Sequence, residues 1–350
     1  MTDRTPDTGT PTTTAGTTRT AGTATTEREL NAERLLRVSA KHSHDPLTEI
    51  DWDAPLDPDQ FAIPPHRVSL YGTPLWETMT HRQRARLSVH ELASTISAGI
   101  WFELILMEGL VRHVYESDLT TKHAQYALTE VADECRHSTM FARYLTKTGY
   151  PSARPTRRAQ RLGRLHFLIN DTTMTFAGAI FVEEFTDALQ REMVRDESLQ
   201  PLARSVARIH VIEEARHIGY AKPELERRWA RLSAPRRALF RQALGLLAQQ
   251  SVAEVIHPRV YALAGLDPRA ARQAAAENPH WQQTKTDWAR KAVQFFTELG
   301  IIDPRSEYRW RRGGRRPAGP PPRGGGGGGG RPARGGGGGA PARAAGAPPA

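Results

Sequence analysis

The sequence predicts an all-α protein, and three observations support this fold class. Proline is absent from residues 75–150, and apolar residues recur there at helical spacing. The rest of the body is divided by Gly and Pro breakers at intervals typical of helices. No segment alternates apolar and polar residues convincingly or carries a hairpin turn, so we expect no sheet.

The expected elements follow from those breakers. Residues 1–26 are rich in Thr, Gly and Pro and are expected to be disordered. Residues 27–75 are expected to form a short helix and a Pro-rich lead-in that wraps the body. After Pro223 the chain either continues a helix past a kink or starts a new one. Residues 76–300 are expected to form the helical domain, with helices at 76–116 (broken near 84), 120–148, 163–197, 201–222, 234–256 and 283–299.

The positive charge is concentrated in the C-terminal tail, residues 311–350. This segment holds eight arginines, no acidic residue and 16 of the 29 glycines, so the first 310 residues carry only +2 of the formal charge of +10. Such a tail cannot bury a core, and we expect it to be disordered. It lacks aromatic residues that would stack on bases, and the body has no basic surplus, so nucleic-acid binding is not expected.

Several classes of protein are excluded by what the sequence lacks. A single cysteine, Cys135, excludes a disulfide framework and a Cys-based zinc or iron–sulfur site. No apolar run reaches the roughly 18 residues that a membrane span needs. The N-terminal residues carry no apolar segment typical of a secretory signal. We therefore expect a cytoplasmic protein with no membrane partner.

An internal repeat carries the candidate chemistry. Residues 133–137 read Asp-Glu-Cys-Arg-His, and residues 213–217 read Glu-Glu-Ala-Arg-His, so each segment is an acid followed by Glu-x-x-His. A further glutamate precedes each central glutamate, and the separation between Glu103 and Glu134 equals the separation between Glu183 and Glu214. The same spacing therefore occurs twice in register, which makes the pattern specific.

A single Glu-x-x-His is a weak signal. The chain contains two more, at residues 254–257 and 277–280, and both adjoin or enclose a proline. Neither has the upstream glutamate of the repeat, because Pro223 and Leu246 stand at the corresponding positions. We interpret these two matches as incidental.

Helix geometry explains how the repeated residues would act together. Glu and His at positions i and i+3 project from one face of a helix, and a preceding antiparallel helix can place its own glutamate against that face. Two such hairpins, packed together, form the ligand set of carboxylate-bridged di-iron or di-manganese proteins. We therefore expect a ferritin-like helical bundle with a dinuclear metal site in its core, flanked by the N-terminal lead-in and extra C-terminal helices. The six ligands are Glu103, Glu134, His137, Glu183, Glu214 and His217.

His210 lies on the same helix face as Glu214 and His217, within about 60° of them at 3.6 residues per turn. We predict a third imidazole ligand there, which makes one metal richer in nitrogen. The equivalent position of the first repeat unit holds Glu130, for which an exposed helix face is expected in preference to the alternative, an outer hydrogen-bond partner of the ligands. Carboxylates combined with imidazoles suit iron, with manganese as the alternative.

Asp133 and Glu213 stand next to the central glutamates. They are candidates for outer partners that hold the ligating imidazoles by hydrogen bonds, although a solvated or ion-paired role explains them equally well. The four glutamates could instead pair with Arg112, Arg136 and Arg216 in a buried ionic lattice. The joint spacing favours a metal site over this lattice and over two unrelated core histidines.

With these residues in place, the sequence resembles the p-aminobenzoate N-oxygenase family of di-iron proteins over residues 76–300. The similar segments are Trp-Phe-Glu103, Asp-Glu134-Cys-Arg-His137, Glu183 and His210-Val-Ile-Glu-Glu214-Ala-Arg-His217. The resemblance implies two iron ions, cycling between Fe2+ and Fe3+, with Glu134 and Glu214 as bridges. It also implies that Glu103 and His137 complete one metal site, while the other is completed by Glu183, His210 and His217.

The resemblance further implies a reaction and its partners. Family members use O2 as a co-substrate to convert an aromatic amine to a hydroxylamine, nitroso or nitro product, and they need an external electron donor or reductase. We expect substrate contacts from Phe102 and Asp187, and we expect a homodimer. One turn from Glu103 lie Gly99 and Met107, so no cation stands there for a substrate carboxylate, and a neutral or bulkier amine fits better.

Four hypotheses of function remain open from the sequence, and the least favoured is an RNA-associated protein that acts through the Arg-Gly tail. The first is a di-iron oxygenase acting on the nitrogen of an aromatic amine. The second keeps the same centre but hydroxylates or desaturates a C–H bond. The third is a ferritin-like protein that oxidises iron without an organic substrate.

Overall fold

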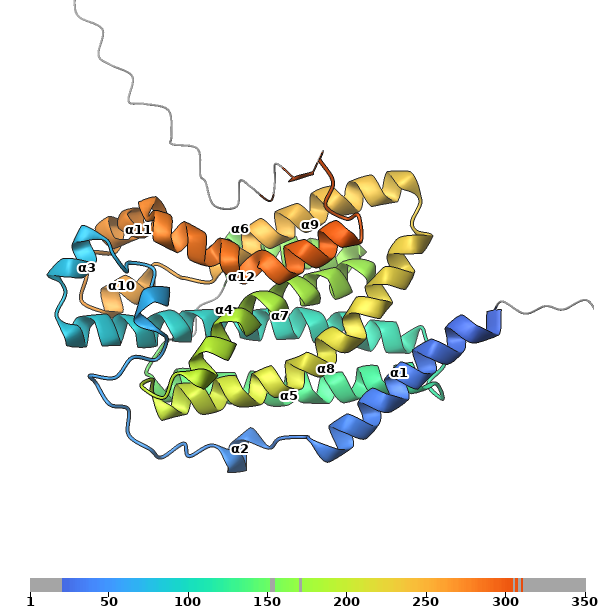
Figure 1. The fold of residues 1–350 in the computed structure, drawn as a ribbon, viewed down its shortest axis with the longest axis horizontal. Helices are drawn as coiled ribbons and strands as arrows, with labels where there is room; N and C mark the ends of the chain where they lie inside the picture. Colours follow the sequence, from blue (N-terminus) through green and yellow to red (C-terminus); the bar gives the residue numbers. More distant parts are fainter. Residues whose placement is uncertain (1–20, 152–154, 170–171, 305, 308–309, 311–350) are drawn as a thin grey trace, which may run out of the picture. The chain divides into compact units, whose positions relative to one another are not determined.

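The computed structural model describes residues 21–151, 155–169, 172–304, 306–307 and 310. Within this part of the chain the fold is all-α and contains no strand, as predicted. Its centre is a bundle of two helical hairpins, one made of α4 (His81–Tyr115) and α5 (Lys122–Lys147), the other of α7 (Thr172–Arg195) and α8 (Pro201–Arg231) (Figure 1). Helix α4 packs on α7 and α5 packs on α8, so the two hairpins enclose a common core.

The start of α4 is set by a capping box. The Thr80 side chain accepts a hydrogen bond from the backbone N–H of Gln83, and the Gln83 side chain accepts one from the backbone N–H of Thr80. The short helix α3 (Pro74–Thr78) therefore ends before α4 begins. The break in the predicted helix 76–116 lies at residues 79–80, and its expected place near residue 84 was wrong.

Helix α4 is long and apolar enough to cross a membrane, with a mean hydropathy of 1.4 in its most apolar 18-residue window. Of that window, 39% is buried in the protein. The helix also carries buried carboxylates, Glu91 and Glu103, and packs between α5 and α7. These contacts assign α4 to the core of the bundle.

The predicted helix 163–197 is two helices. Helix α6 (Arg157–Ile169) starts earlier than expected because the hydroxyl of Thr156 accepts a hydrogen bond from the backbone N–H of Ala159. It packs against α4, where Gly163 lies over Ile105. Helix α7 then begins at Thr172.

Helix α8 continues to Arg231 with Pro223 inside it, which selects the continuous helix from the two alternatives that the sequence left open. A proline removes one backbone hydrogen bond from a helix. Packing of residues on both sides of Pro223 compensates for this loss, because Tyr220, Leu225 and Trp229 are all buried.

The remaining helices surround the bundle. Helix α1 (Ala21–Lys41) packs on α5 and α8, while α9 (Ala234–Glu254) and α12 (Pro279–Glu298) pack on α7. Three short helices, α2 (Pro46–Glu49), α10 (Arg259–Leu263) and α11 (Pro268–Glu277), and one 3-10 helix, η1 (Pro65–Arg67), complete the described part. None of these four was predicted.

The boundary expected between a disordered segment and the first helix was wrong, since α1 begins at Ala21 and not at residue 27. Helix formation is cooperative, and α1 is held on the bundle further along by Arg28, which forms a bidentate ion pair with Glu224, and by Glu29, which binds His123. The predicted disorder of residues 1–20 and of the tail 311–350 lies outside the described residues.

The lead-in is attached to the body by buried polar contacts. Glu91 of α4 accepts hydrogen bonds from the backbone N–H of Ser69 at 2.9 Å and from its hydroxyl at 2.5 Å. The Asn278 side chain donates to the carbonyl of Ser69 at 2.9 Å, and Tyr261 contacts the same hydroxyl at 3.0 Å. Pairing each buried polar group in this way compensates for its loss of water.

Candidate metal centre

All seven predicted ligands meet in the core of the bundle. Their donor atoms form three overlapping groups, in each of which the atoms lie within 4.8 Å of one another. These groups are Glu134–His137–Glu214–His217, Glu103–His137–His210 and Glu183–His210–Glu214. Every member is buried.

The four helices position these side chains as the repeat predicted. Glu103 comes from α4, Glu183 from α7, and the two Glu-x-x-His pairs come from α5 and α8. On each of the latter helices the i and i+3 residues share the buried face. The spacing between the upstream glutamate and the Glu-x-x-His is the same in both hairpins. Each hairpin therefore places its upstream glutamate at the same height in the bundle as its Glu-x-x-His.

The two central glutamates lie between the two central histidines. Nδ1 of His137 is 3.0 Å from a carboxylate oxygen of Glu134 and 3.2 Å from one of Glu214. Nδ1 of His217 is 2.9 Å from Glu134 and 3.2 Å from Glu214. Each carboxylate therefore faces both imidazoles, which is the arrangement that a bridging role requires.

His210 joins the cluster from one side. Its Nε2 atom lies 3.5 Å from oxygens of both Glu103 and Glu214, and its Nδ1 atom lies 2.8 Å from Oε1 of Gln190. The ring packs beside Phe141, with centroids 5.0 Å apart. His210 thus presents Nε2 to the cluster, whereas His137 and His217 present Nδ1.

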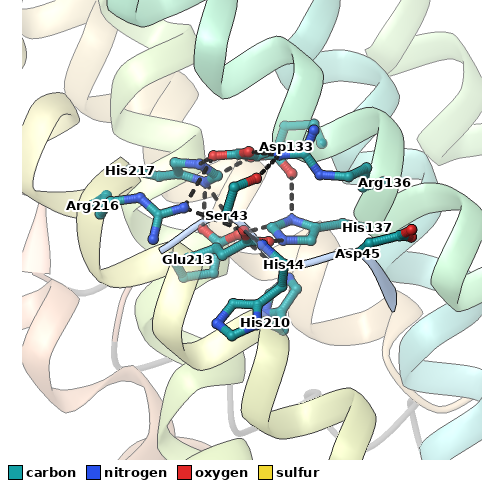
Figure 2. Close-up of polar contacts among 12 residues, drawn as sticks. Ser43, His44, Asp45, Asp133, Arg136, His137, His210, Glu213, Arg216 and His217 are labelled. Atoms are coloured by element: carbon teal, nitrogen blue, oxygen red, sulfur yellow. Dashed lines mark hydrogen bonds and ion pairs between the residues drawn. The ribbon is translucent and has the colours of Figure 1, made fainter. Parts of the chain in front are cut away.

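Asp133 and Glu213 bind the far nitrogens of the two central imidazoles, and they do so crosswise (Figure 2). Glu213 on α8 lies 2.8 Å from Nε2 of His137 on α5, and Asp133 on α5 lies 3.2 Å from Nε2 of His217 on α8. A carboxylate on the second nitrogen orients an imidazole and fixes its tautomer. The crossing also ties α5 to α8.

The arginine of each repeat neutralises this outer pair of acids. Arg136 pairs with Asp133, and Arg216 lies 3.3 Å from both Asp133 and Glu213. The lead-in closes the layer, since the backbone N–H of His44 donates to Glu213 at 3.2 Å and Arg136 donates to Ser43 at 3.1 Å (Figure 2). Among the described ion pairs, none joins an arginine to a predicted ligand glutamate, which argues against the ionic lattice.

Glu130, the counterpart of His210 in the first hairpin, is only 1% exposed. The expectation of an exposed position for it was therefore wrong. The cause is tertiary, because α5 is covered by α4, α8 and α1. Glu130 lies outside the three donor groups, and its Oε2 atom has no hydrogen-bond partner among the described residues.

Protonation at the cluster follows from burial and from the mutual repulsion of the carboxylates. Burial and the charges of Glu134 and Glu214 raise the pKa of Glu103 well above its ordinary value. Burial and Glu214 also act to raise the pKa of Glu134, but His217 and His137 outweigh them and lower it to about 2. Burial lowers the pKa of His210 to about 4, so this imidazole is neutral and free to act as a ligand.

The pKa of Glu183 is raised in the same way as that of Glu103, by burial first and then by the neighbouring carboxylates. Burial and repulsion thus favour the protonated form of both outer glutamates, Glu103 and Glu183. Binding of divalent cations would release those protons, because ligating carboxylates must be ionised.

The donor set fits a pair of metal ions. Three buried ligand atoms have no hydrogen-bond partner among the described residues: Oε2 of Glu103, Oε2 of Glu183 and Nε2 of His210. Such atoms are costly in a dry core unless a cation binds them. Four carboxylates also balance the charge of two divalent ions. Carboxylate and imidazole donors in this combination suit iron or manganese.

Two small cavities adjoin the cluster on the side of His210. The first has a volume of about 30 Å³ and is lined by Glu103, Glu183 and His210, and the second, of about 20 Å³, lies next to it. They share the walls formed by Thr95, Gly99, Val182, Phe185 and Thr186. Each has room for water but not for an aromatic ring, so a larger ligand requires the shared side chains to move.

The structure places the two predicted substrate contacts differently. Phe102 lines the second cavity. Asp187 is absent from the described lining of either cavity, and its Oδ2 atom lies 2.7 Å from Arg191 and 3.1 Å from Lys291. The substrate-binding role of Asp187 stays a prediction without a supporting contact, because its helix position turns it toward α12.

Sequence reasoning missed three parts of the site. Gln190 lies two helical turns after Glu183 on α7, and helical periodicity could have indicated it. Trp288 of α12 lines the first cavity, and residues 42–45 cover the outer acids. No local signal links either of these to the cluster, since both reach it through tertiary packing.

Comparison with known families gives one match that covers most of the chain. The family described as P-aminobenzoate N-oxygenase AurF matches residues 25–300. This range includes all seven clustered side chains and both hairpins.

Two mycobacterial proteins are also similar. An uncharacterized protein of Mycobacterium tuberculosis (Rv0885) and one of Mycobacterium bovis (Mb0909) are each 29% identical over 206 residues, which is 57% of this chain. The match spans 61% of the length of each relative.

Proposed function

The chain belongs to the P-aminobenzoate N-oxygenase AurF family, and from this membership we propose that it is a di-iron oxygenase acting on the nitrogen of an aromatic amine. The family is a di-iron oxygenase family, so the chain is an oxidoreductase at that level. The observation that carries the finer proposal is the convergence of four carboxylates and three imidazoles beside an apolar cavity.

The proposed ligand assignment places Glu134 and Glu214 as bridges between two irons. Their support is that each lies within 3.2 Å of Nδ1 of both central histidines. Glu103 and His137 complete one site in this proposal. The other is completed by Glu183, His210 and His217.

Iron held there would supply O2 binding and the redox equivalents for oxygen transfer. The protein's own part is to hold the ligands in their working tautomers. Glu213, Asp133 and Gln190 accept hydrogen bonds from the outward nitrogens of His137, His217 and His210. These contacts aim the other nitrogen of each ring at the cluster, where it would bind a metal ion once its own proton is released.

The cavity walls would exclude water and orient the ring of the substrate. Leu92, Ile96, Phe141, Leu189 and Trp288 present apolar surface next to the ligand side chains. A dry wall limits side reactions of an activated oxygen species with solvent. Because Phe185 and Thr186 line both cavities, we propose that movement of these side chains opens room for the ring.

Conversion of an amine to a hydroxylamine consumes one O2, two electrons and two protons, and it releases one water. An external electron donor or reductase is therefore part of the proposal. We also propose a cytoplasmic homodimer, as expected from the sequence.

The test is a single-turnover experiment on the protein loaded anaerobically with ferrous iron. The loaded protein is mixed with aniline derivatives and 18O2, and the products are identified by mass spectrometry. The expected result is about two irons per chain and 18O bound to nitrogen in the product. Label on carbon would support the C–H hydroxylase alternative, and iron oxidation without any organic product would support the ferritin-like one. Either of these outcomes would contradict N-oxygenation.

A further inference from the structure

The polar groups that line the first cavity are few, and most are already occupied. Apart from the ligand side chains, they are Thr95, Thr186, Gln190 and the indole N–H of Trp288. The Thr95 hydroxyl donates to the carbonyl of Glu91 at 3.0 Å, and the Thr186 hydroxyl donates to the carbonyl of Val182 at 3.1 Å. Both hydroxyls are thus bonded within their own helices. Two donors remain: the amide of Gln190, which also contacts His210, and the indole Nε1 of Trp288, which has no hydrogen-bond partner among the described residues.

The two ends of the Gln190 amide have different surroundings. Nε2 of His210 faces the carboxylates of the cluster and must be unprotonated to bind a metal, so Nδ1 carries the proton. Its partner at 2.8 Å must then be the carbonyl oxygen of Gln190 and not the amide nitrogen. The amide nitrogen, with two N–H groups, donates to no described residue and belongs to a side chain that lines the cavity.

The distance along α7 suits a substrate whose amine is at the cluster. Gln190 follows Glu183 by about two turns, which is about 10 Å of helix. An aromatic amine placed with its nitrogen near Glu183 therefore points the far side of its ring toward Gln190. A substituent at that position would meet the free N–H groups.

The charge of the cavity selects against an anionic substituent. No lysine or arginine is among the described residues that line either cavity. The nearby lysines, Lys222 and Lys291, are bound to Glu184 and Asp187 on the α12 side of α7. A carboxylate in the cavity would be buried without a counter-charge, which is far more costly than burying a neutral group.

We propose that Gln190 is a positioning and specificity-determining residue with two roles. Its carbonyl oxygen holds His210 with Nε2 toward the metal centre. Its amide group donates a hydrogen bond to an uncharged acceptor on the ring of the amine substrate. The substrate class is therefore a neutral aromatic amine that carries a hydrogen-bond acceptor opposite the amino group. This inference rests on the proposed function and departs from the anion after which the family is named.

The test compares two ligands of matched shape, 4-aminobenzamide and 4-aminobenzoate, with 4-methylaniline as the ligand that has no acceptor. Binding to the purified full-length protein is measured by calorimetry, with and without iron. The expected result is that the amide binds about five- to tenfold more tightly than 4-methylaniline, the gain typical of one net hydrogen bond. The benzoate is expected to bind at least about tenfold more weakly than the amide.

Two variants separate the two roles. Gln190→Glu keeps an oxygen for His210 but loses the amide donors, so it should retain bound iron and lose the preference for the amide over 4-methylaniline. Gln190→Leu removes both functions, so it should lose that preference and also bind iron more weakly, by about 10- to 100-fold. Gln294→Glu, the same change on the exposed face of α12, is the matched control and should alter neither quantity.

The failures are distinguishable. The inference about Gln190 would be overturned by equal binding of the amide and the benzoate to the natural protein. It would also be overturned if Gln190→Glu still preferred the amide over 4-methylaniline. In either case, N-oxygenation of any amine would leave the proposed function intact. A protein that neither binds nor oxidises any of the three amines would overturn both.

Discussion

The two ends of the metal centre are related by the internal repeat and differ in two pairs of residues. At the end formed by the second hairpin, His210 points at the cluster and Gln190 holds its outer nitrogen. At the equivalent positions of the repeat, the first hairpin has Glu130 and Leu110. The second hairpin therefore has both the extra imidazole, His210, and its hydrogen-bond partner, Gln190. The first hairpin has neither.

The two ends of the metal centre also differ in how tightly side chains pack around them. Ile96, which lines the first cavity, and the buried Met140 stand at the repeat positions that hold Phe176 and Tyr220 in the second hairpin. The rings of Phe176 and Tyr220 lie 5.9 Å apart and are fully buried, and neither lines the two cavities found among the described residues. The repeat thus builds the two matched sets of candidate ligands, while departures from the repeat leave a cavity at one end, the open end, and aromatic packing at the other, the closed end.

The largest expected effect concerns the histidines of the two Glu-x-x-His pairs, which both ends of the metal centre have. His137→Ala and His217→Ala should each remove at least one iron per chain, because each deletes an imidazole that faces both central glutamates. Metal analysis of the purified variants measures this. Glu254→Ala is the control, since Glu254 binds Thr156 at the surface and should leave iron content unchanged. Iron loss in the control but not in the histidine variants would mean that the wrong Glu-x-x-His pairs were chosen.

The next effect tests whether the symmetry extends to the outer acids. Asp133→Ala and Glu213→Ala should each lower iron affinity by about 10- to 100-fold, because each leaves one central imidazole unoriented. Competition with a chelator measures the affinity. Glu192→Ala, which removes an acid that pairs with Arg67 away from the cluster, is the control. If only one of the two variants lost iron affinity, the two ends would be equivalent in their candidate ligands but not in the outer acids that bind them.

A third prediction compares glycines at the two ends. A Cβ at Gly109 would lie 2.4 Å from Cγ2 and 3.0 Å from Cβ of Thr175, so α4 and α7 must separate to admit it. Gly109→Ala should lower the free energy of unfolding by about 1–3 kcal/mol. Gly99→Ala meets only Phe141 at 3.6 Å and should be neutral or stabilising by up to about 1 kcal/mol. Urea denaturation of both variants checks this, and equal destabilisation would refute the difference in packing.

The smallest effect is a change in pH dependence at the closed end. Burial, assisted by the charges of Glu134, Glu214 and Asp133, raises the pKa of Glu130 well above 4.5 against the opposing charge of His217. Above pH 4.5 the unfolded chain loses this proton while the folded protein keeps it, so the natural protein loses stability as pH rises. The Glu130→Gln variant has no carboxyl group at this position, so its stability does not decrease with pH for this reason.

The stability of Glu130→Gln relative to the natural protein should therefore grow between pH 5 and pH 6, by up to about 1.4 kcal/mol, the limit for one proton over one pH unit. Denaturation of the metal-free proteins at the two pH values measures it. A difference that stays constant with pH would show that Glu130 is ionised in the folded protein.

Much of the fold and the candidate site was predictable from local patterns. The all-α class followed from helical periodicity, and the repeated spacing predicted which six residues would meet. The failures also have local causes: the start of α6 depends on the hydroxyl of Thr156, and the break before α4 depends on the side chains of Thr80 and Gln83. Such caps involve single hydrogen bonds, which many threonines in this chain could have made.

The sequence by itself determined the identity and the pairing of the candidate ligands. The spacing from the upstream glutamate to the Glu-x-x-His is the same in both hairpins, so one arrangement of the four helices places all of these side chains at the same height. Only the tertiary structure decided which nitrogen of each histidine faces the cluster, that Asp133 and Glu213 bind the histidine of the opposite helix, and that Gln190 presents an amide to the cavity. These features depend on contacts between helices far apart in the chain. No periodicity within a single helix encodes them, since they are set by how the packed helices turn toward one another.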